Sequence, residues 1–306
     1  MKFKTIAAGA WCLSPASQRH AKAPTRHPRA QRGVSLVELM VGITIGLLVV
    51  AVAMGSLMVS SGISGTVSDA SSIQQQAAYA MRVIGLQLRQ AGSLYLNPNP
   101  TNAAAGNEYM ATVAFETTAP ASSAGSNSFD PATDTLSSAN GALTVGYRRY
   151  KDAVFTDAAA QSLARNCVGG PTNSSEDKRV ESIFQLNGTE LQCSGNGAAA
   201  QPQPIIQNIA NFQTRYLIQD VTTTPGDPKI KYVNAAAVGT EWSKVQGVEV
   251  CLVLYGSESI DMPAGSSYTD CDGTTAINMI TLTGARARRM HMVFRSVYQL
   301  RSQGLM

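Results

Sequence analysis

The chain has 306 residues, with 24 basic and 20 acidic side chains. Residues 1–33 contain seven of the basic side chains and no acidic one, so the rest of the chain carries 17 basic and 20 acidic groups, a net charge of −3. The excess of basic over acidic side chains therefore lies in the first 33 residues, which argues against nucleic acid as a partner of the remaining chain.

An apolar segment dominates the N-terminal part of the chain. No charged residue occurs from Leu39 to Val59, and about 20 apolar residues in a helix cover roughly 30 Å of hydrocarbon. Glu38 stands at the start of this segment, where an unpaired acid costs about 3 kcal/mol on membrane-insertion scales. The segment predicts a single membrane span with a cytoplasmic N-terminus, because only basic residues precede it: Arg19, Lys22, Arg26, Arg29 and Arg32.

The segment Gly33-Val34-Ser35-Leu36-Val37-Glu38 resembles the processing motif of type IV pilins and pseudopilins. In these proteins a basic leader ends in Gly, and the fifth residue after it is Glu. The resemblance implies cleavage after Gly33 by a prepilin peptidase and methylation of the new amino terminus. Val34 replaces the usual Phe at the first mature position, which excludes N-methyl-phenylalanine. A plain membrane anchor with an incidental acid is the alternative.

Glu38 needs a cationic partner once the apolar helices bundle, because a carboxylate in low dielectric is costly unless it is paired. The nearest cation would be the amino terminus created at Val34. We hypothesise that the Glu38 carboxylate pairs with the Val34 ammonium of an adjacent subunit and sets the axial register of a filament.

The helical period continues beyond Val59. Polar side chains, among them Asp69 and Gln87, are expected on the face that water covers. Gly92 predicts the end of the helix, so we expect one helix from about Val34 to Ala91. Its second half should carry a stripe for a sheet to cover, formed by Ile63, Val67, Ala70, Ala77, Met81, Ile84, Leu88 and Ala91.

The rest of the chain predicts strands and long loops. Residues 93–141 read as a long loop with one short strand at Ala111–Glu116, and Asn187-Gly188 predicts the turn of a hairpin over Glu181–Cys193. The pattern is that of an α+β protein, a long helix packed on a mostly antiparallel sheet. The other expected strands are Leu143–Tyr150, Ile205–Gln219, Lys229–Val233, the apolar and hence central Val245–Tyr255, and Arg286–Arg301.

Four cysteines lie on the expected exported side of the apolar segment. An even number of cysteines in an oxidising compartment predicts two disulfides. Three connectivities are open, and we expect the sequential one because it closes the shortest loops. The spacing of a zinc knuckle is absent from this set, which comprises Cys167, Cys193, Cys251 and Cys271.

Enzymatic chemistry has little support in the sequence. His291 is the only histidine after residue 33, no nucleophile motif accompanies it, and we expect a half-exposed strand residue. Asp270-Cys271-Asp272-Gly273 lacks the spaced ligands of a calcium loop. We therefore expect no enzyme, cofactor or metal. A basic cluster is expected to form a solvated strand face or to contact acidic patches on neighbouring subunits, with DNA capture as a minor option: Arg286, Arg288, Arg289, Arg295 and Arg301.

Three regions resemble the PilW family of minor pilins: the apolar helix with its continuation Ala77–Gly92, the segment Trp242–Leu254, and the Arg-rich strand Arg286–Arg295. The resemblance implies the type IV pilin fold. It divides the chain into a leader (1–33), a transmembrane or filament-core helix (34–60), the amphipathic continuation of that helix (61–92) and an exported β-rich domain (93–306).

The function that the resemblance implies is that of a minor pilin in type IV pilus assembly, in a priming or tip complex that serves motility or adhesion. The implied partners are major and other minor pilins, the prepilin peptidase, the inner-membrane assembly platform and, before assembly, membrane lipid. The protein would move from the inner membrane to the periplasm and the surface pilus. A J-type pseudopilin of a type II secretion system and an anchored periplasmic binding or adhesive domain are the alternatives.

Overall fold

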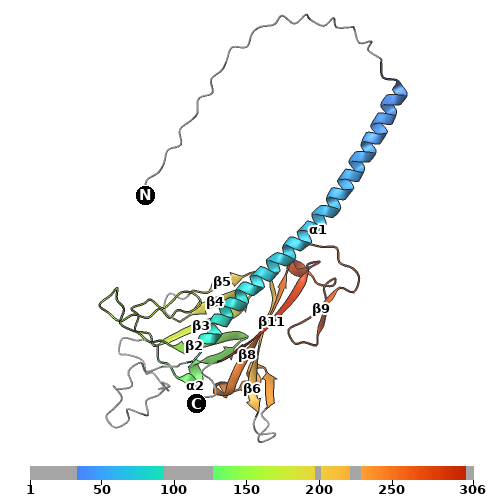
Figure 1. Ribbon diagram of the computed structural model, residues 1–306. Helices are drawn as coiled ribbons and strands as arrows, with labels where there is room; N and C mark the ends of the chain where they lie inside the picture. The colour runs from blue at the N-terminus through green and yellow to red at the C-terminus, as the bar shows by residue number, and fades with distance from the viewer. Residues whose placement is uncertain (1–32, 93–126, 197–200, 221–228, 301–306) are drawn as a thin grey trace, which may run out of the picture. The chain divides into compact units, whose positions relative to one another are not determined.

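The computed structural model describes residues 33–92, 127–196, 201–220 and 229–300 (Figure 1). The chain divides into two compact units, Met1–Ser56 and Leu57–Met306. Most of the predicted leader, the predicted strand at 111–116 and Arg301 lie outside the described residues.

A single long helix, α1 (Leu36–Gln90), accounts for the N-terminal part of the described chain. Ser35 begins it as a cap, because its hydroxyl accepts the backbone N–H of Glu38 at 3.2 Å and its carbonyl accepts that of Leu39 at 3.1 Å. Gly92 ends the helix with φ 89°, a left-handed conformation that glycine adopts without a steric penalty. The helix therefore begins and ends within two residues of the predicted positions.

The first sheet has five strands in the order β1-β2-β3-β4-β5, and every pair is antiparallel. The short helix α2 (Pro131–Asp134) leads into it. In the β3–β4 hairpin Asn187 pairs with Glu190, so the turn is Gly188-Thr189, one residue later than predicted. The strands are β1 (Leu136–Ala139), β2 (Ala142–Arg148), β3 (Arg179–Asn187), β4 (Glu190–Gly195) and β5 (Gln203–Ile206).

The second sheet has four antiparallel strands in the order β11-β8-β6-β7. β8 is central and only Gln246 within it is not buried, as its continuous apolar run predicts. A separate two-stranded hairpin, β9 (Ser267–Thr269) with β10 (Ala276–Asn278), follows β8 in the chain. The four strands are β6 (Ile209–Asp220), β7 (Lys229–Val233), β8 (Val245–Tyr255) and β11 (His291–Gln299), and the connections include α3 (Ala235–Val238) and the 3-10 turns η2 (Trp242–Lys244) and η3 (Gly284–Arg286).

Two predicted strands differ from the structure. The predicted strand Ile205–Gln219 is divided at Asn208, whose φ of 59° turns the chain, so β5 belongs to the first sheet and β6 to the second. The predicted strand Arg286–Arg301 starts later, at His291, because the 3-10 turn η3 and the positive φ of Arg288 (53°) precede it. The single sheet expected from the sequence is therefore two larger sheets and a hairpin.

The core lies between the C-terminal half of α1 and both larger sheets, which flank this part of the helix in Figure 1. The covered stripe of α1 begins later than predicted, since Ile63 and Val67 are 60% and 63% exposed. One continuous cluster joins residues from the helix (Ile73, Ala77, Ala80, Ile84, Leu88), the first sheet (Leu143, Phe184, Leu191) and the second sheet (Val248, Leu252).

Candidate functional site

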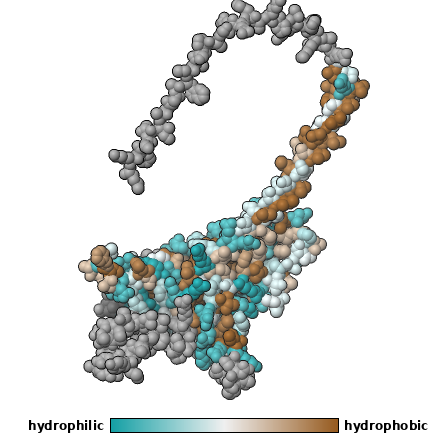
Figure 2. Space-filling model, in the orientation of Figure 1, coloured by the Kyte–Doolittle hydropathy of each residue, from teal (hydrophilic) through white to brown (hydrophobic). Residues whose placement is uncertain are grey.

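The N-terminal half of α1 exposes an apolar surface along its whole length. Every residue from Leu36 to Val59 is exposed, and apolar side chains dominate this part of the helix in Figure 2. Among the described residues, α1 is the one helix long and apolar enough to cross a membrane. Monomeric soluble proteins rarely leave a contiguous patch of more than a few hundred Å² of such surface in water. This half of the helix therefore requires lipid or other protein around it.

The three residues predicted to direct processing and assembly lie at the start of this helix. Gly33 and Val34 precede it, and Val34 is 67% exposed. Glu38 lies in the first helical turn, and its carboxylate forms no ion pair with any described residue. Ser35 and Glu38 have the spacing of a capping box, a signal that the sequence reasoning missed.

The capping contribution does not by itself account for an acid at this position. A carboxylate in the first turn gains about 0.3–1 kcal/mol from the helix dipole. Exposure of the same charge to hydrocarbon costs about 3 kcal/mol. The deficit of about 2 kcal/mol is what a cationic partner would have to offset.

Asp69 connects α1 by hydrogen bonds to the loop that follows β8. The side chain is only 5% exposed, so its predicted place on the solvent face is wrong. Its carboxylate accepts the backbone N–H and the hydroxyl of Ser257 at 2.8 and 2.9 Å and the backbone N–H of Glu258 at 3.4 Å. Gly256 leaves room for this contact, since a Cβ there would lie 1.7 Å from Asp69 Oδ2.

Gln87, also predicted on the solvent face, is buried against the first sheet. Its side-chain oxygen accepts the hydroxyl of Ser182 at 2.9 Å. On the second sheet, the Tyr298 hydroxyl donates to the Met81 carbonyl at 2.6 Å, while its ring fills the space beside Gly85, where a Cβ would lie 2.4 Å from Tyr298 Cε1. Polar contacts thus fix the rotation of α1 against both larger sheets.

Two disulfides close loops of the β-rich part of the chain. Cys251 of β8 is bonded to Cys271 with a Cα–Cα distance of 5.7 Å, and both are buried. Cys167 is bonded to Cys193 of β4 with a Cα–Cα distance of 6.3 Å. These are the sequential pairs, which bridge the shortest sequence separations open to the four cysteines.

Two family models match the chain. Residues 28–54 match the prokaryotic N-terminal methylation motif, and residues 173–302 match the family described as type IV pilus-assembly protein W. The chain is a type IV pilin-like protein and is similar to the PilW family over residues 173–302. Among solved structures, a type IV-like pilin from Thermus thermophilus is similar, with 15% identity over 54% of this chain and 81% of that one at a TM-score of 0.27. No curated protein matches the sequence.

The second match spans both C-terminal regions whose residues resemble PilW, Trp242–Leu254 and Arg286–Arg295. Pilins are structural subunits, and this PilW-like chain is therefore not an enzyme. The architecture is α+β, a long N-terminal apolar helix with antiparallel sheets, as predicted.

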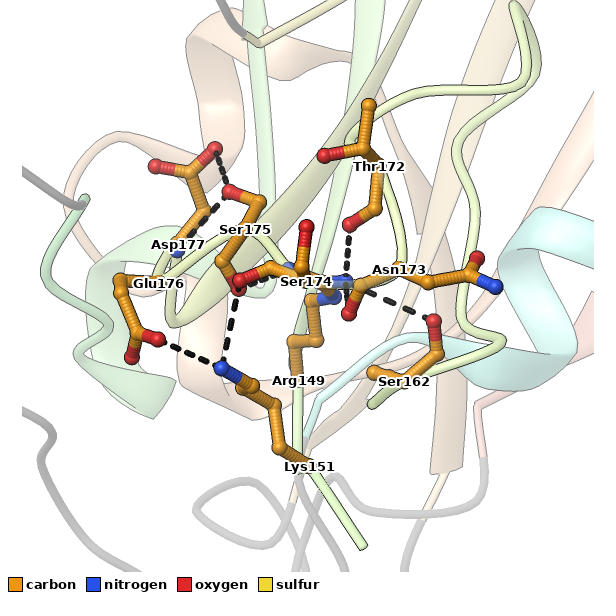
Figure 3. Close-up of polar contacts among 9 residues, drawn as sticks. All are labelled: Arg149, Lys151, Ser162, Thr172, Asn173, Ser174, Ser175, Glu176 and Asp177. Carbon is orange, nitrogen blue, oxygen red and sulfur yellow. Dashed lines mark hydrogen bonds and ion pairs between the residues drawn. The ribbon is translucent and has the colours of Figure 1, made fainter. Parts of the chain in front are cut away.

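The buried Arg149 of this pilin-like protein illustrates how its loops are held (Figure 3). Its guanidinium, 1% exposed, donates to the carbonyls of Ser175 at 2.7 Å and Asn173 at 3.0 Å, and also to that of Thr172. Burial lowers the pKa of this guanidinium. Nearby, Lys151 pairs with Glu176 (Figure 3). Carbonyl groups of the loop surround the Arg149 charge, so the hydrogen bonds of this cluster stabilise the loop.

His291 is buried, so the predicted half-exposed position is wrong. It is 6% exposed and stacks on Tyr268 with ring centroids 5.1 Å apart. Its Nδ1 contacts the Arg289 carbonyl at 2.8 Å, and its Nε2 accepts Arg286 Nε at 3.2 Å. Burial lowers the pKa of the imidazole. Both ring nitrogens are therefore engaged in packing contacts.

The four described arginines of the cluster contact this chain's own groups, while Arg288 and Arg295 are exposed as predicted. Arg286 donates to the Tyr268 hydroxyl at 2.7 Å and Arg289 to the Gly256 carbonyl at 3.0 Å. Arg295 donates to the Asp270 carbonyl at 2.6 Å. Arg288 forms an exposed ion pair with Asp261 at 2.9 Å.

The carboxylates of the turn after β9 likewise accept hydrogen bonds from groups of this chain. The Asp272 carboxylate accepts hydrogen bonds from the Thr275 hydroxyl and from the backbone N–H groups of Thr275 at 2.8 Å and Thr274 at 2.9 Å, and these hydrogen bonds lower its pKa. Asp270 accepts Asn211 Nδ2 at 2.9 Å. Among the described residues no group of three or more His, Cys, Asp or Glu side chains is placed to hold a metal ion.

Proposed function

We propose that this chain is a minor pilin of a type IV pilus. It enters the inner membrane with its N-terminus in the cytoplasm, loses residues 1–33 by prepilin peptidase cleavage after Gly33, and is methylated at Val34. It then assembles through the N-terminal half of α1, in a priming or tip complex with the major and other minor pilins on the inner-membrane assembly platform.

The observation that carries this proposal is the exposure of α1 from Leu36 to Val59. A surface this apolar is stable in lipid before assembly, and a bundle of similar helices replaces the lipid afterwards. Transfer between two apolar environments has a small free-energy cost, whereas passage into water costs about 25 cal/mol per Å² of apolar surface. The apolar surface of α1 is therefore typical of a subunit that moves from the membrane into a filament without exposing this surface to water.

Glu38 supplies register in this scheme. Its carboxylate pairs with the Val34 ammonium of an adjacent subunit, a contact that exists only after cleavage has created that amine. The free position of the carboxylate in the first turn of α1 supports this pairing. Removal of one partner from a buried ion pair is expected to cost about 3–5 kcal/mol, because an uncompensated charge remains.

The test compares Glu38→Gln with Ser35→Ala. Glu38→Gln keeps the size and the backbone contact to Ser35 but removes the charge, and it should be cleaved normally yet be lost from sheared surface filaments. Ser35→Ala removes the helix cap, worth about 1 kcal/mol, and should still be incorporated. Normal incorporation of Glu38→Gln would refute the role of the charge.

The same fractions separate the rival functions. A J-type pseudopilin would be cleaved, and its deletion would abolish secretion of exported proteins while surface pili remain. An anchored periplasmic domain would stay in the inner membrane with residues 1–33 attached. Recovery of the cleaved chain in sheared pili, with loss of pili on deletion, is the result expected of a minor pilin.

A further inference from the structure

The exported half of α1 presents a second outward surface, opposite the core. Gln75, Tyr79, Arg82, Leu86 and Arg89 follow each other at steps of four and three residues, which places them along one line of the helix. All five are exposed, Tyr79 by 55% and Leu86 by 50%. We call this line the α1 ridge. It turns away from Ile73, Ala77, Ala80, Ile84 and Leu88, which face the core.

A groove runs along each side of the α1 ridge. One, of about 560 Å³, lies between Gln75, Gln76 and Tyr79 of the helix and residues 204–208, which comprise the end of β5 and the β5–β6 connection. The other, of about 410 Å³, lies between the helix and β11, where Arg82, Leu86 and Arg89 line it together with Ser296 and Tyr298. A ridge with a groove on either side offers the shape into which an opposing surface interlocks.

The charge of this surface has a single sign. No acidic residue occurs from Ala70 to Gly92, and neither groove is lined by one. Arg82 and Arg89 have no hydrogen-bond or ion-pair partner among the described residues. Seven residues separate them, about 10 Å along the helix. Asp69, the nearest acid along the sequence, is buried in its contact with Ser257.

We propose that the α1 ridge docks onto an acidic surface of a different pilin subunit. That surface carries two carboxylates about 10 Å apart, one for each guanidinium, on either side of apolar side chains that cover Leu86 and Tyr79. The inference rests on the proposed function for the presence of such a subunit. The arginines would supply specificity and faster association, and the buried apolar side chains most of the affinity.

A different subunit fits better than the other occupants of such a surface. Several of this chain's own carboxylates are already paired within it: Glu176 with Lys151, Glu241 with Lys244, and Asp261 with Arg288. This reduces the acidic surface that a second copy has to offer. Nucleic acid is disfavoured, because two cations with apolar side chains around them neutralise too few phosphates.

The test places a photo-crosslinking phenylalanine analogue at position 86 or 79 in cells that assemble pili. After illumination, mass spectrometry of the cross-linked peptides should identify an acidic segment of another pilin subunit. Arg82→Glu combined with Arg89→Glu should lower the cross-link yield about tenfold, since like charges would then face each other. Replacement of the identified carboxylates by Lys should restore the yield.

Lys229→Glu is the matched control, because Lys229 is also exposed but lies on β7, away from the ridge. It should leave the cross-link yield unchanged. A yield that does not respond to the double charge reversal would overturn the inference, as would cross-links that form only to nucleic acid, to lipid or to a second copy of this chain.

The same cells report cleavage of residues 1–33 and recovery in sheared pili. Normal cleavage and recovery without an acidic cross-link would overturn this inference and leave the proposed function intact. Retention of residues 1–33 in the inner membrane would overturn the proposed function, and the filament partner with it.

Discussion

The close approach of Asp69 to Gly256 predicts how substitutions at these two positions change the stability of the β-rich domain. The Asp69 carboxylate accepts three hydrogen bonds from Ser257 and Glu258. Bonds to a charged group contribute about 1.5–3 kcal/mol, and water reaches the exposed donors when the carboxylate is removed. We therefore expect Asp69→Ala to lower the free energy of unfolding by about 2 kcal/mol.

Gly256→Ala should cost a similar amount for the same reason. Its Cβ would lie 1.7 Å from Asp69 Oδ2, so the carboxylate must leave its donors, and overpacking of this kind costs about 1–3 kcal/mol. The double variant should lose only about 2 kcal/mol, because Asp69→Ala empties the space that the new methyl needs. Independent effects would add to about 4 kcal/mol.

The assay is thermal and urea unfolding of the cleaved chain in detergent, followed by tryptophan fluorescence. Trp11 lies in the predicted leader, so in the chain that begins at Val34 the reporter is Trp242, packed edge-on against Tyr216 at 4.9 Å. A loss of about 2 kcal/mol should lower the Tm by about 6 °C. Gly62→Ala is the control, because nothing lies within 4 Å of its Cβ. Additive losses in the double variant would refute the reasoning.

Three further predictions concern packing, the disulfides and pH. Gly85→Ala should destabilise the domain by about 1–2 kcal/mol despite the better helix propensity of Ala, because its Cβ would lie 2.4 Å from the Tyr298 ring. Urea unfolding of this variant and of Gly62→Ala measures the difference. Equal stability of the two variants would contradict the close contact with Tyr298. Replacement of Cys251 and Cys271 by Ser opens a loop of sequence separation 20 and should cost about 3 kcal/mol, visible as a lower urea midpoint than that of the parent chain when both are measured without reductant. Burial lowers the pKa of His291 from its ordinary value of 6.5, so its contribution is fully present above pH 6.5 and declines as the pH falls through the lowered pKa. Between pH 7 and pH 5 the His291→Gln variant should therefore lose less stability than the parent chain, and parallel losses would contradict this.

Local sequence signals predicted the elements that depend on neighbours in the chain. The continuous apolar run predicted β8 as a central strand, and Asn187-Gly188 predicted the β3–β4 hairpin to within one residue. The division between β5 and β6 coincides with the left-handed backbone of Asn208. A single residue of this kind does not change the spacing of apolar side chains along the sequence, so one sheet was predicted where the structure has two.

Side-chain burial on α1 was harder to predict, because its partners are distant in sequence. Asp69 and Gln87 count as solvent residues in any hydrophobic period, yet each is buried by a partner 188 or 95 residues further along the chain. The helical conformation of the apolar half of α1 was predicted correctly, since its length and composition alone indicate it. The roles of Gly33, Val34 and Glu38 remain predictions, because they depend on a processed and assembled state of the protein.

Intact-mass and peptide mass spectrometry of the protein from sheared pili tests the central claim most directly. The claim is that a processed subunit exchanges lipid for neighbouring helices along the apolar half of α1. The predicted result is a polypeptide that begins at Val34 and carries one added methyl group on its amino terminus. A polypeptide that retains any of residues 1–33, or that is found in the inner membrane and never in pili, would contradict it.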